Sequence, residues 1–138
     1  MIKYIEGNIF DSNAQALVNT VNLVGVMGKG IALQFKKKYP ENYVLYKKAC
    51  SNKTIDIGKL FVTKATDLNG EKLIINFPTK IDWRKSSEYS YIEEGLTDLI
   101  TIIRTYKINS IALPPLGSGN GGLDWNKTNN YKQIIKFK

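Results

Sequence analysis

The sequence has no histidine and a single cysteine among its 138 residues. Without imidazole, the chain cannot form a Ser-His-Asp or Cys-His catalytic centre, or a zinc site that depends on histidine. One thiol, Cys50, excludes an internal disulfide and a four-thiolate metal site. Any acid, base or nucleophile must therefore come from Asp, Glu, Lys, Tyr, Ser or Thr. We expect a reaction that needs no metal and no cofactor.

Long apolar runs are also missing. No stretch approaches the roughly eighteen apolar residues of a membrane-spanning helix. The first residues contain no basic segment followed by a long apolar one, so a signal peptide is not expected. The lone cysteine fits a cytoplasmic protein. The length is that of one domain covering residues 1–138, and we expect a monomer.

The charge of the chain is unbalanced, with 20 Lys and Arg against 12 Asp and Glu and a net charge of +8. Such an excess is typical of proteins that bind phosphates or nucleic acid. It can equally reflect biased composition, because the chain is rich in Ile and Asn and nearly all its cations are Lys. Composition alone leaves both interpretations open.

Apolar strands alternate with amphipathic helices along the chain. A helix is predicted on the face formed by Ile31, Phe35 and Tyr39, with Pro40 ending it. Another begins near Ser87, or at a capping box formed by Ser90 and Glu93. Its predicted buried stripe is Ile92, Leu96, Leu99, Ile103 and Tyr106. Further helices are predicted over 41–49 and within 125–135, and strands over 3–5, 16–21, 60–63, 72–77 and 111–113. This alternation predicts a three-layer α/β domain with a mostly parallel or mixed sheet.

Two glycine-rich turns, at residues 25–30 and 117–122, each follow an apolar strand and precede a helix. In open α/β sheets, ligands bind where the strands end. Glycines there let backbone N–H groups approach phosphate oxygens, and a helix N-terminus adds a favourable partial charge. Neither turn is a dinucleotide fingerprint or a P-loop, and either alone could simply be a tight turn. Together they favour a clamp on a pyrophosphate.

The segments 7–9, 16–22 and 25–32 resemble the opening of a macrodomain. Residues 76–84 and 113–125 resemble, more specifically, the DarG-type family of DNA ADP-ribosyl glycohydrolases. The likeness implies an α/β/α macrodomain with a mixed central sheet that binds ADP-ribose. It implies an enzyme that removes ADP-ribose from thymidine bases of DNA. The implied partners are ADP-ribosylated DNA and a cognate DNA ADP-ribosyltransferase toxin, against which the chain would act as antitoxin.

The resemblance also implies roles for individual residues. Asn8 stands where macrodomains usually carry an Asp that accepts a hydrogen bond from adenine, and its amide oxygen can still accept it. Asn22 should face the distal ribose, and Asn19 either contacts the ligand or caps the loop. Residues 25–30 would wrap the distal ribose and one phosphate. The residues implied to contact ADP-ribose are Asn8, Ile9, Asn19, Asn22, Gly25, Val26, Met27, Gly28, Gly30, Thr79, Pro115, Leu116, Gly117, Ser118, Gly119, Asn120, Gly121 and Gly122.

Lys80 is the candidate catalytic residue. Related hydrolases pair a Lys with an Asp in the second glycine-rich turn, but that turn has no Asp here, and Asp124 comes later and could instead stabilise the start of a helix. The Lys80 amine would attack the anomeric carbon of the distal ribose and form a Schiff base, or would donate a proton to the leaving base. The plain alternative is a surface lysine at the end of a strand.

Three classes of function stay open. The first is removal of ADP-ribose from DNA, the second is hydrolysis of ADP-ribosylated proteins or small molecules, and the third is a non-catalytic ADP-ribose reader. Lys80 favours the two enzymes. Trp83 and Arg84 favour DNA, because an aromatic face can stack a base and an Arg can bind a phosphate, although Trp83 could be ordinary packing. Macrodomains usually end in a strand, which is either missing here or formed by residues 134–137.

Overall fold

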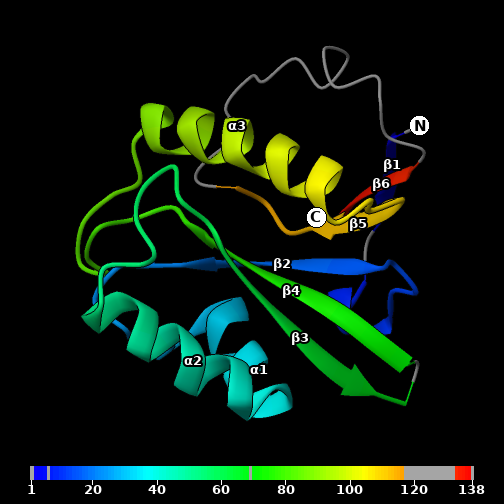
Figure 1. The fold of residues 1–138 in the computed structure, drawn as a ribbon, viewed down its shortest axis with the longest axis horizontal. Helices are drawn as coiled ribbons and strands as arrows, with labels where there is room; N and C mark the ends of the chain where they lie inside the picture. Colours follow the sequence, from blue (N-terminus) through cyan, green and yellow to red (C-terminus); the bar gives the residue numbers. More distant parts are fainter. Residues whose placement is uncertain (1, 6, 69, 117–132, 138) are drawn as a thin grey trace.

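The computed structural model describes residues 2–5, 7–68, 70–116 and 133–137. The strands in this part of the chain form one six-stranded sheet, in the order β1-β6-β5-β2-β4-β3. Helices α1 and α2 lie on one face of the sheet and α3 lies on the other (Figure 1). The predicted three-layer α/β/α fold is confirmed. The elements are β1 Ile2–Ile5, η1 Ile9–Asp11, β2 Ala16–Val21, α1 Gly30–Lys38, α2 Pro40–Ser51, β3 Phe61–Asp67, β4 Gly70–Pro78, α3 Tyr89–Thr105, β5 Ser110–Leu113 and β6 Gln133–Phe137.

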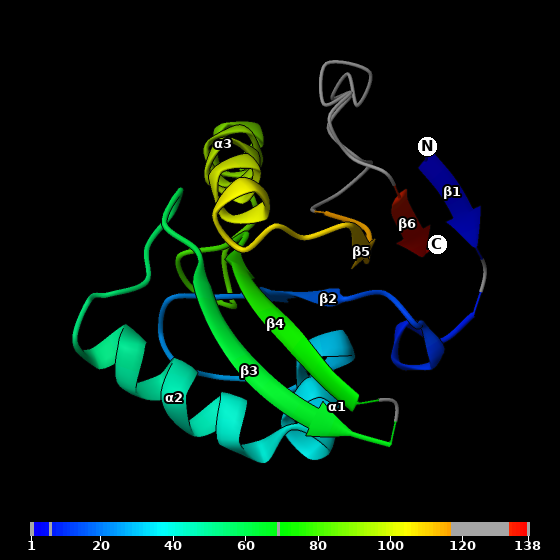
Figure 2. The ribbon, with the colours of Figure 1, turned by 45° about the vertical axis from the view of Figure 1, so that its right-hand side comes forward.

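The sheet is mixed, with β3 as its antiparallel strand. β2 runs parallel to both β4 and β5, and β6 runs parallel to both β5 and β1. β3 and β4 form a long antiparallel hairpin (Figure 2). Because β2 and β4 are parallel neighbours, Val21 and Pro78 lie opposite each other where both strands end. Open α/β sheets bind ligands at this edge.

The central strands are buried on both faces, which explains why they are continuously apolar. Val18 and Ile75 pack on the side covered by α3. Their neighbours Leu17 and Ile74 point to the opposite face and pack near Phe35 of α1. Successive residues of a strand point to opposite faces, so each central strand contributes to two cores.

The C-terminal segment differs from the predicted helix. A helix was predicted within residues 125–135, and the end of this range is wrong. Gln133–Phe137 is a strand that lies between β1 and β5. The last strand is therefore present, and residues 134–137 belong to it. The predicted start of that helix lies outside the described residues.

Helix α3 begins close to Ser87, as one of the two predicted starts had it, but differs from the prediction in its capping and at its C-terminal end. The Ser90 capping box is wrong, because the helix begins at Tyr89 and its N-cap, Glu88, makes no side-chain capping bond. Tyr106 is not buried but 42% exposed. The helix ends before Tyr106, the chain turns through a left-handed Lys107 with a φ of 53°, and Ile108 enters the core instead.

Within the described residues, no helix is long and apolar enough to cross a membrane.

Gly95 lets α3 lie directly on β4, because a Cβ at this position would clash with the ring of fully buried Phe77. Alanine favours a helix over glycine by about 1 kcal/mol, but overpacking a core costs about 1–3 kcal/mol. Because the clash with Phe77 is severe, overpacking should outweigh the helix gain, and we expect Gly95→Ala to lower the free energy of unfolding by up to about 2 kcal/mol, measured by urea denaturation. Thr101→Ala, at an exposed position of the same helix, is the control and should not destabilise. A Gly95→Ala protein as stable as this control would contradict the close packing.

Candidate functional site

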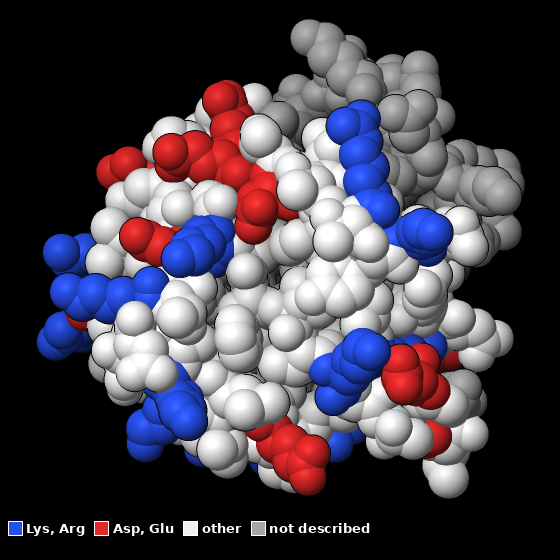
Figure 3. Space-filling model, viewed as in Figure 1, with Lys and Arg blue, Asp and Glu red and all other residues white. Residues whose placement is uncertain are grey.

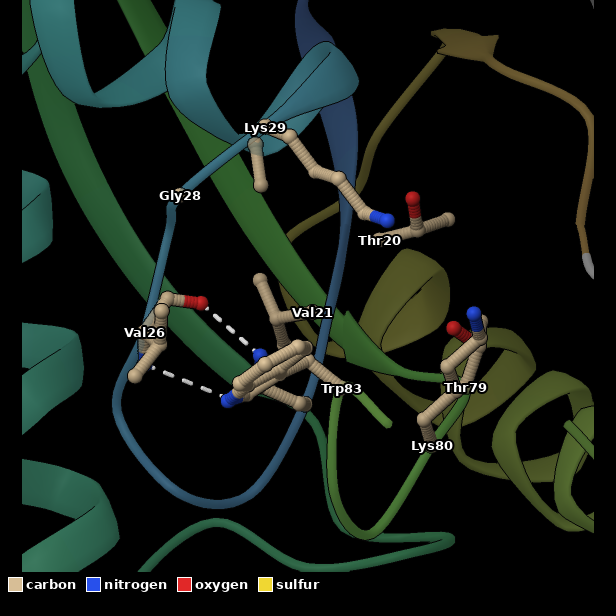
Figure 4. A pocket seen from close by; sticks show the side chains of 10 residues that line it. Thr20, Val21, Val26, Gly28, Lys29, Thr79, Lys80 and Trp83 are labelled. Atoms are coloured by element: carbon tan, nitrogen blue, oxygen red, sulfur yellow. Dashed lines mark hydrogen bonds between the residues drawn. The ribbon is translucent and has the colours of Figure 1, made fainter. Parts of the chain in front are cut away.

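A cavity of about 380 Å³ opens where β2 and β4 end. This volume falls in the range of small-molecule sites. The cavity is walled by the ends of both strands, the loop after β2, the start of α1 and the segment after β4 (Figure 4). We call it the strand-end pocket. Its lining residues are Thr20, Val21, Asn22, Val26, Gly28, Lys29, Ala32, Thr79, Lys80 and Trp83.

A second cavity of about 340 Å³, which we call the turn pocket, lies beside the entry to η1. It brings the adjacent residues Asn8 and Ile9 together with Pro115, which is far from them in the sequence, and all three were predicted to share a site. Asn8 also caps η1, since its Oδ1 accepts a hydrogen bond of 3.0 Å from the N–H of Phe10. The remaining lining residues, Gly7, Ile31, Gln34 and Pro114, were not identified from the sequence.

The start of α1 lies between the two pockets. Lys29 and Ala32 line the strand-end pocket, whereas Ile31 lines the turn pocket. The N-cap, Lys29, makes no side-chain capping bond. A helix start leaves its first N–H groups without intrahelical acceptors and carries a partial positive charge. A ligand that filled both pockets would therefore pass a region suited to negative charge.

Asn22 holds the loop that follows β2 in shape. Its Oδ1 accepts hydrogen bonds from the N–H groups of Val24 and Val26, at 3.1 and 3.3 Å. Its Nδ2 donates a bond of 2.8 Å to the carbonyl of Val26. Gly25 adopts a φ of +86°, which L side chains rarely adopt. The loop-capping role that the sequence left open for Asn19 thus belongs to Asn22, which also lines the strand-end pocket.

Tyr46 of α2 anchors this loop through hydrogen bonds to Asn22. Its side chain is fully buried, and its hydroxyl lies 2.8 Å from both the carbonyl oxygen and the Oδ1 of Asn22. Burial raises the pKa of Tyr46 above its usual range, so the hydroxyl stays protonated and donates. The more exposed Tyr43 reaches the carbonyl of Gly25 at 3.5 Å. The loop is therefore fixed to α2 as well as to itself.

Asn19 lies beneath the strand-end pocket and lines neither cavity. It is fully buried, and its Nδ2 donates to Asn76 Oδ1 at 3.3 Å and lies 3.9 Å from the sulfur of Met27. Asn76 in turn exchanges hydrogen bonds with Asn42 of α2, at 3.1 and 2.9 Å. Asn19 and Met27 therefore belong to the buried layer that supports the site, and the Oδ1 of Asn19 has no hydrogen-bond partner among the described residues.

The backbone continues to pair beyond the ends of β2 and β4. The N–H of Thr79 donates to the carbonyl of Val21 at 2.9 Å, and the N–H of Leu23 donates to that of Ile81 at 3.1 Å. Lys80, between them, is half-buried and lines the strand-end pocket. Lys29 reaches into the same pocket from the start of α1, toward Thr20 (Figure 4). The site therefore contains two amines, of which the sequence identified only one.

Trp83 also lines the strand-end pocket and is 49% exposed. Arg84 does not line it. Its guanidinium pairs with Asp82 through contacts of 2.8 and 3.1 Å and lies 5.5 Å from the centre of the Trp83 ring. This pairing lowers the pKa of the Asp82 carboxyl to about 2. The expected phosphate contact of Arg84 is not supported, because a carboxylate already neutralises its charge.

The remaining predicted site residues either line neither pocket or lie outside the described residues, and the strand-end pocket contains further residues that were not predicted. Gly25, Gly30 and Leu116 line neither pocket, and Leu116 packs in the core. Residues 117–122 and Asp124 lie outside the described residues. Thr20, Val21, Lys29 and Ala32 line the strand-end pocket but were not predicted. Their position at a strand end or in the first helical turn was the available signal.

Charge is unevenly distributed over the surface. In the view of Figure 3, acidic side chains gather over α3, which carries Glu93, Glu94 and Asp98, and basic side chains are scattered over the rest of this face. Among the described residues, no three His, Cys, Asp or Glu side chains gather as a metal site would require. The net charge of +8 therefore does not form one continuous basic surface on this face.

The fold and the paired pockets define an α/β domain whose cavities open where parallel strands end. The Macro domain family model matches residues 18–131, and the chain belongs to this family.

The chain is similar to proteins of two bacteria in both sequence and structure. The chain is 58% identical over 125 residues to a DNA ADP-ribosyl glycohydrolase of Mycobacterium tuberculosis, covering 91% of this chain but only 36% of that protein. The solved macrodomain of Mycobacterium tuberculosis DarG is 49% identical, with a TM-score of 0.88 and coverage of 99% and 97% of the two chains. Thermosipho africanus DarTG, solved in complex with ADP-ribose, is 32% identical, with a TM-score of 0.86, covering 99% of this chain and 41% of that one.

Tyr46→Phe should loosen the loop that Asn22 caps. It removes the hydroxyl that donates to Asn22 and adds no bulk. We expect a loss of about 1 kcal/mol in the free energy of unfolding. The Val24 and Val26 amides should exchange their hydrogens about fivefold faster, as measured by NMR, if local opening becomes easier by that amount. Tyr43→Phe, which removes a longer 3.5 Å contact, is the matched control and should have little effect. Equal effects of the two variants would argue against Tyr46 as the anchor.

Proposed function

We propose that this domain binds ADP-ribose and releases it from thymidine bases of DNA. The observation that carries the proposal is the pair of pockets on either side of the start of α1. ADP-ribose has the matching order of parts, with adenine at one end, a diphosphate in the middle and a second ribose at the other end. The Mycobacterium tuberculosis relative is a DNA ADP-ribosyl glycohydrolase and the Thermosipho africanus structure contains ADP-ribose, and both support the assignment.

Each part of ADP-ribose has a complementary region. Adenine fits the turn pocket, where Ile9, Ile31 and Pro115 offer apolar surface. Asn8 Oδ1 already accepts from Phe10 but has a second lone pair for the adenine amino group. The diphosphate passes the start of α1, where Lys29 and the free N–H groups favour anions. The distal ribose then occupies the strand-end pocket.

Lys80 is the residue that we assign to the chemistry, because it lines the pocket proposed for the distal ribose. Its unprotonated amine attacks the anomeric carbon, the bond to the thymine nitrogen breaks, and thymine leaves and takes up a proton. Loss of a proton from the attached nitrogen and opening of the sugar ring give a Schiff base. Water then releases ADP-ribose and regenerates the amine. In the alternative role, Lys80 protonates the departing thymine while water attacks the same carbon.

The remaining features favour DNA over protein as the carrier of ADP-ribose. The exposed Trp83 at the mouth of the pocket suits a base better than a flexible peptide. An enzyme that removes ADP-ribose from DNA implies a transferase that attaches it, so we propose a cognate DNA ADP-ribosyltransferase toxin as the functional partner and an antitoxin role for this chain. A DNA substrate and the lone Cys50 together favour the cytoplasm.

Release of ADP-ribose from single-stranded DNA tests the proposal. We expect the protein to act on thymidine-linked ADP-ribose faster than on ADP-ribosylated protein. Lys80→Ala should lower the rate by ~10²-fold or more. It should leave ADP-ribose affinity within about tenfold, or about 1.4 kcal/mol. Rates are measured by chromatography and affinity by calorimetry, with Lys64→Ala on the exposed face of β3 as the control.

Other outcomes would select the other classes of function. Faster turnover of modified protein would assign the domain to protein hydrolysis. Binding of ADP-ribose without turnover of either substrate would make it a reader. Full activity of Lys80→Ala would remove Lys80 from the mechanism.

Borohydride reduction during turnover separates the two roles of Lys80. A Schiff base is reduced to a stable amine, so the nucleophilic route should leave ADP-ribose covalently attached to Lys80, detectable by peptide mass spectrometry. Wild-type protein reduced with ADP-ribose but without modified DNA is the control for non-specific glycation. If Lys80→Ala is inactive and no adduct forms, only the proton-donor role survives.

A further inference from the structure

Four exposed apolar side chains lie on the two loops beside the strand-end pocket. Val24, Val26, Ile81 and Trp83 are 49%, 40%, 45% and 49% exposed, and we call them the apolar rim. They come from two loops that are joined by the hydrogen bond from Leu23 to Ile81. Val26 and Trp83 also line the pocket, so the rim continues its wall. Contiguous exposed apolar surface beside a ligand site is typical of an interaction surface.

Trp83 is held in place within this rim. The Arg84 guanidinium lies 5.5 Å from its ring centre and is itself held by two hydrogen bonds to Asp82. Arg84 lowers the pKa of Asp82 to about 2, so both partners of the pair are charged near neutral pH. Arg84 therefore supports the aromatic ring, and its neutralised charge makes it a poor ligand for phosphate.

The charges inside the pocket narrow the choice of occupant. Lys29 and Lys80 both line the pocket, whereas the rim outside is apolar. The complementary ligand places negative groups inward and a flat apolar group against Trp83. ADP-ribosylated single-stranded DNA has this arrangement, because its diphosphate meets Lys29 while an unmodified neighbouring base can stack on an aromatic side chain. A peptide carries a flat group beside its ADP-ribose only where its sequence has an aromatic residue.

We propose that the apolar rim stacks the unmodified base next to the ADP-ribosylated thymidine, with Trp83 as the platform. This inference rests on the proposed function and adds to it. It makes a neighbouring nucleotide part of what the site recognises. ADP-ribose and the modified base fill the pocket, and the neighbouring base covers its mouth.

A double-mutant cycle on binding tests the stack. The Lys80→Ala protein, which should not consume the substrate, is titrated with two oligonucleotides bearing ADP-ribosylated thymidine, one with normal flanking bases and one with abasic flanks. Adding Trp83→Ala should weaken binding of the normal oligonucleotide by roughly 5- to 150-fold. It should affect the abasic oligonucleotide much less, and Trp83→Phe should restore most of the difference.

Controls separate stacking from misfolding and from the proposed function. Tyr106→Ala, an exposed aromatic at the far end of α3, should affect neither oligonucleotide. Equal losses for both oligonucleotides in Trp83→Ala would overturn the stack. Because binding is the readout, flank-dependent coupling would still support the rim if the wild type proved unable to cleave DNA.

The Asp82–Arg84 pair provides a second readout. If Arg84 acts by holding Trp83, then Arg84→Ala and Asp82→Asn should weaken binding of the normal oligonucleotide to a similar extent, with unchanged dependence on salt. If Arg84 instead binds a phosphate, Arg84→Ala alone should weaken binding and reduce the salt slope by about one. The latter result would contradict the supporting role assigned to Arg84.

Discussion

The fully buried amide of Asn76, on β4, is the interaction on which the geometry of the site depends. It exchanges hydrogen bonds with Asn42 of α2 and accepts another from Asn19 of β2. Buried amides are costly without partners, so this network fixes where α2 lies on the sheet. Asn42 and Tyr46 are one helical turn apart and share a face of α2. Asn76 thus fixes the position of α2, and Tyr46 of this helix in turn fixes Asn22 and the loop that Asn22 caps.

The local arrangement of charges matters more here than the net charge. Two lysines line the strand-end pocket, whereas the arginine beside it is neutralised by Asp82. On the face shown in Figure 3, acidic groups cover α3. The overall excess of Lys therefore says little about recognition. Two lysines line the pocket and the exposed apolar rim lies beside it, which favours a ligand whose polar groups point inward.

Elements were predictable from the sequence where one physical signal dominated. β2 has the predicted bounds because an apolar run is enclosed by polar segments, and Lys80 lies in the pocket because it follows a buried strand. The roles of Asn19 and Asn22 were harder to separate, since inward orientation depends on strand register and loop capping depends on tertiary contacts. The role of the Lys29 side chain was not predicted, because the glycines on both sides indicated that this turn contacts a ligand through backbone N–H groups. The pairing of Arg84 with Asp82 could not be predicted from composition, because it depends on the turn that brings the two side chains together.

The Asn22-capped loop and the segment that carries Lys80 are joined by backbone hydrogen bonds that continue past the last residues of β2 and β4. The bonds from Thr79 to Val21 and from Leu23 to Ile81 extend the β2–β4 ladder on either side of Lys80. A reaction that depends on an amine meeting one carbon tolerates little misplacement. Here, the separation between the Asn22-capped loop and Lys80 is set by backbone hydrogen bonds, which are stiffer than side-chain contacts. Ile81 takes part in this backbone pairing, and Trp83 follows it by two residues. A base bound at the rim and a sugar bound in the pocket would therefore have a fixed position relative to each other.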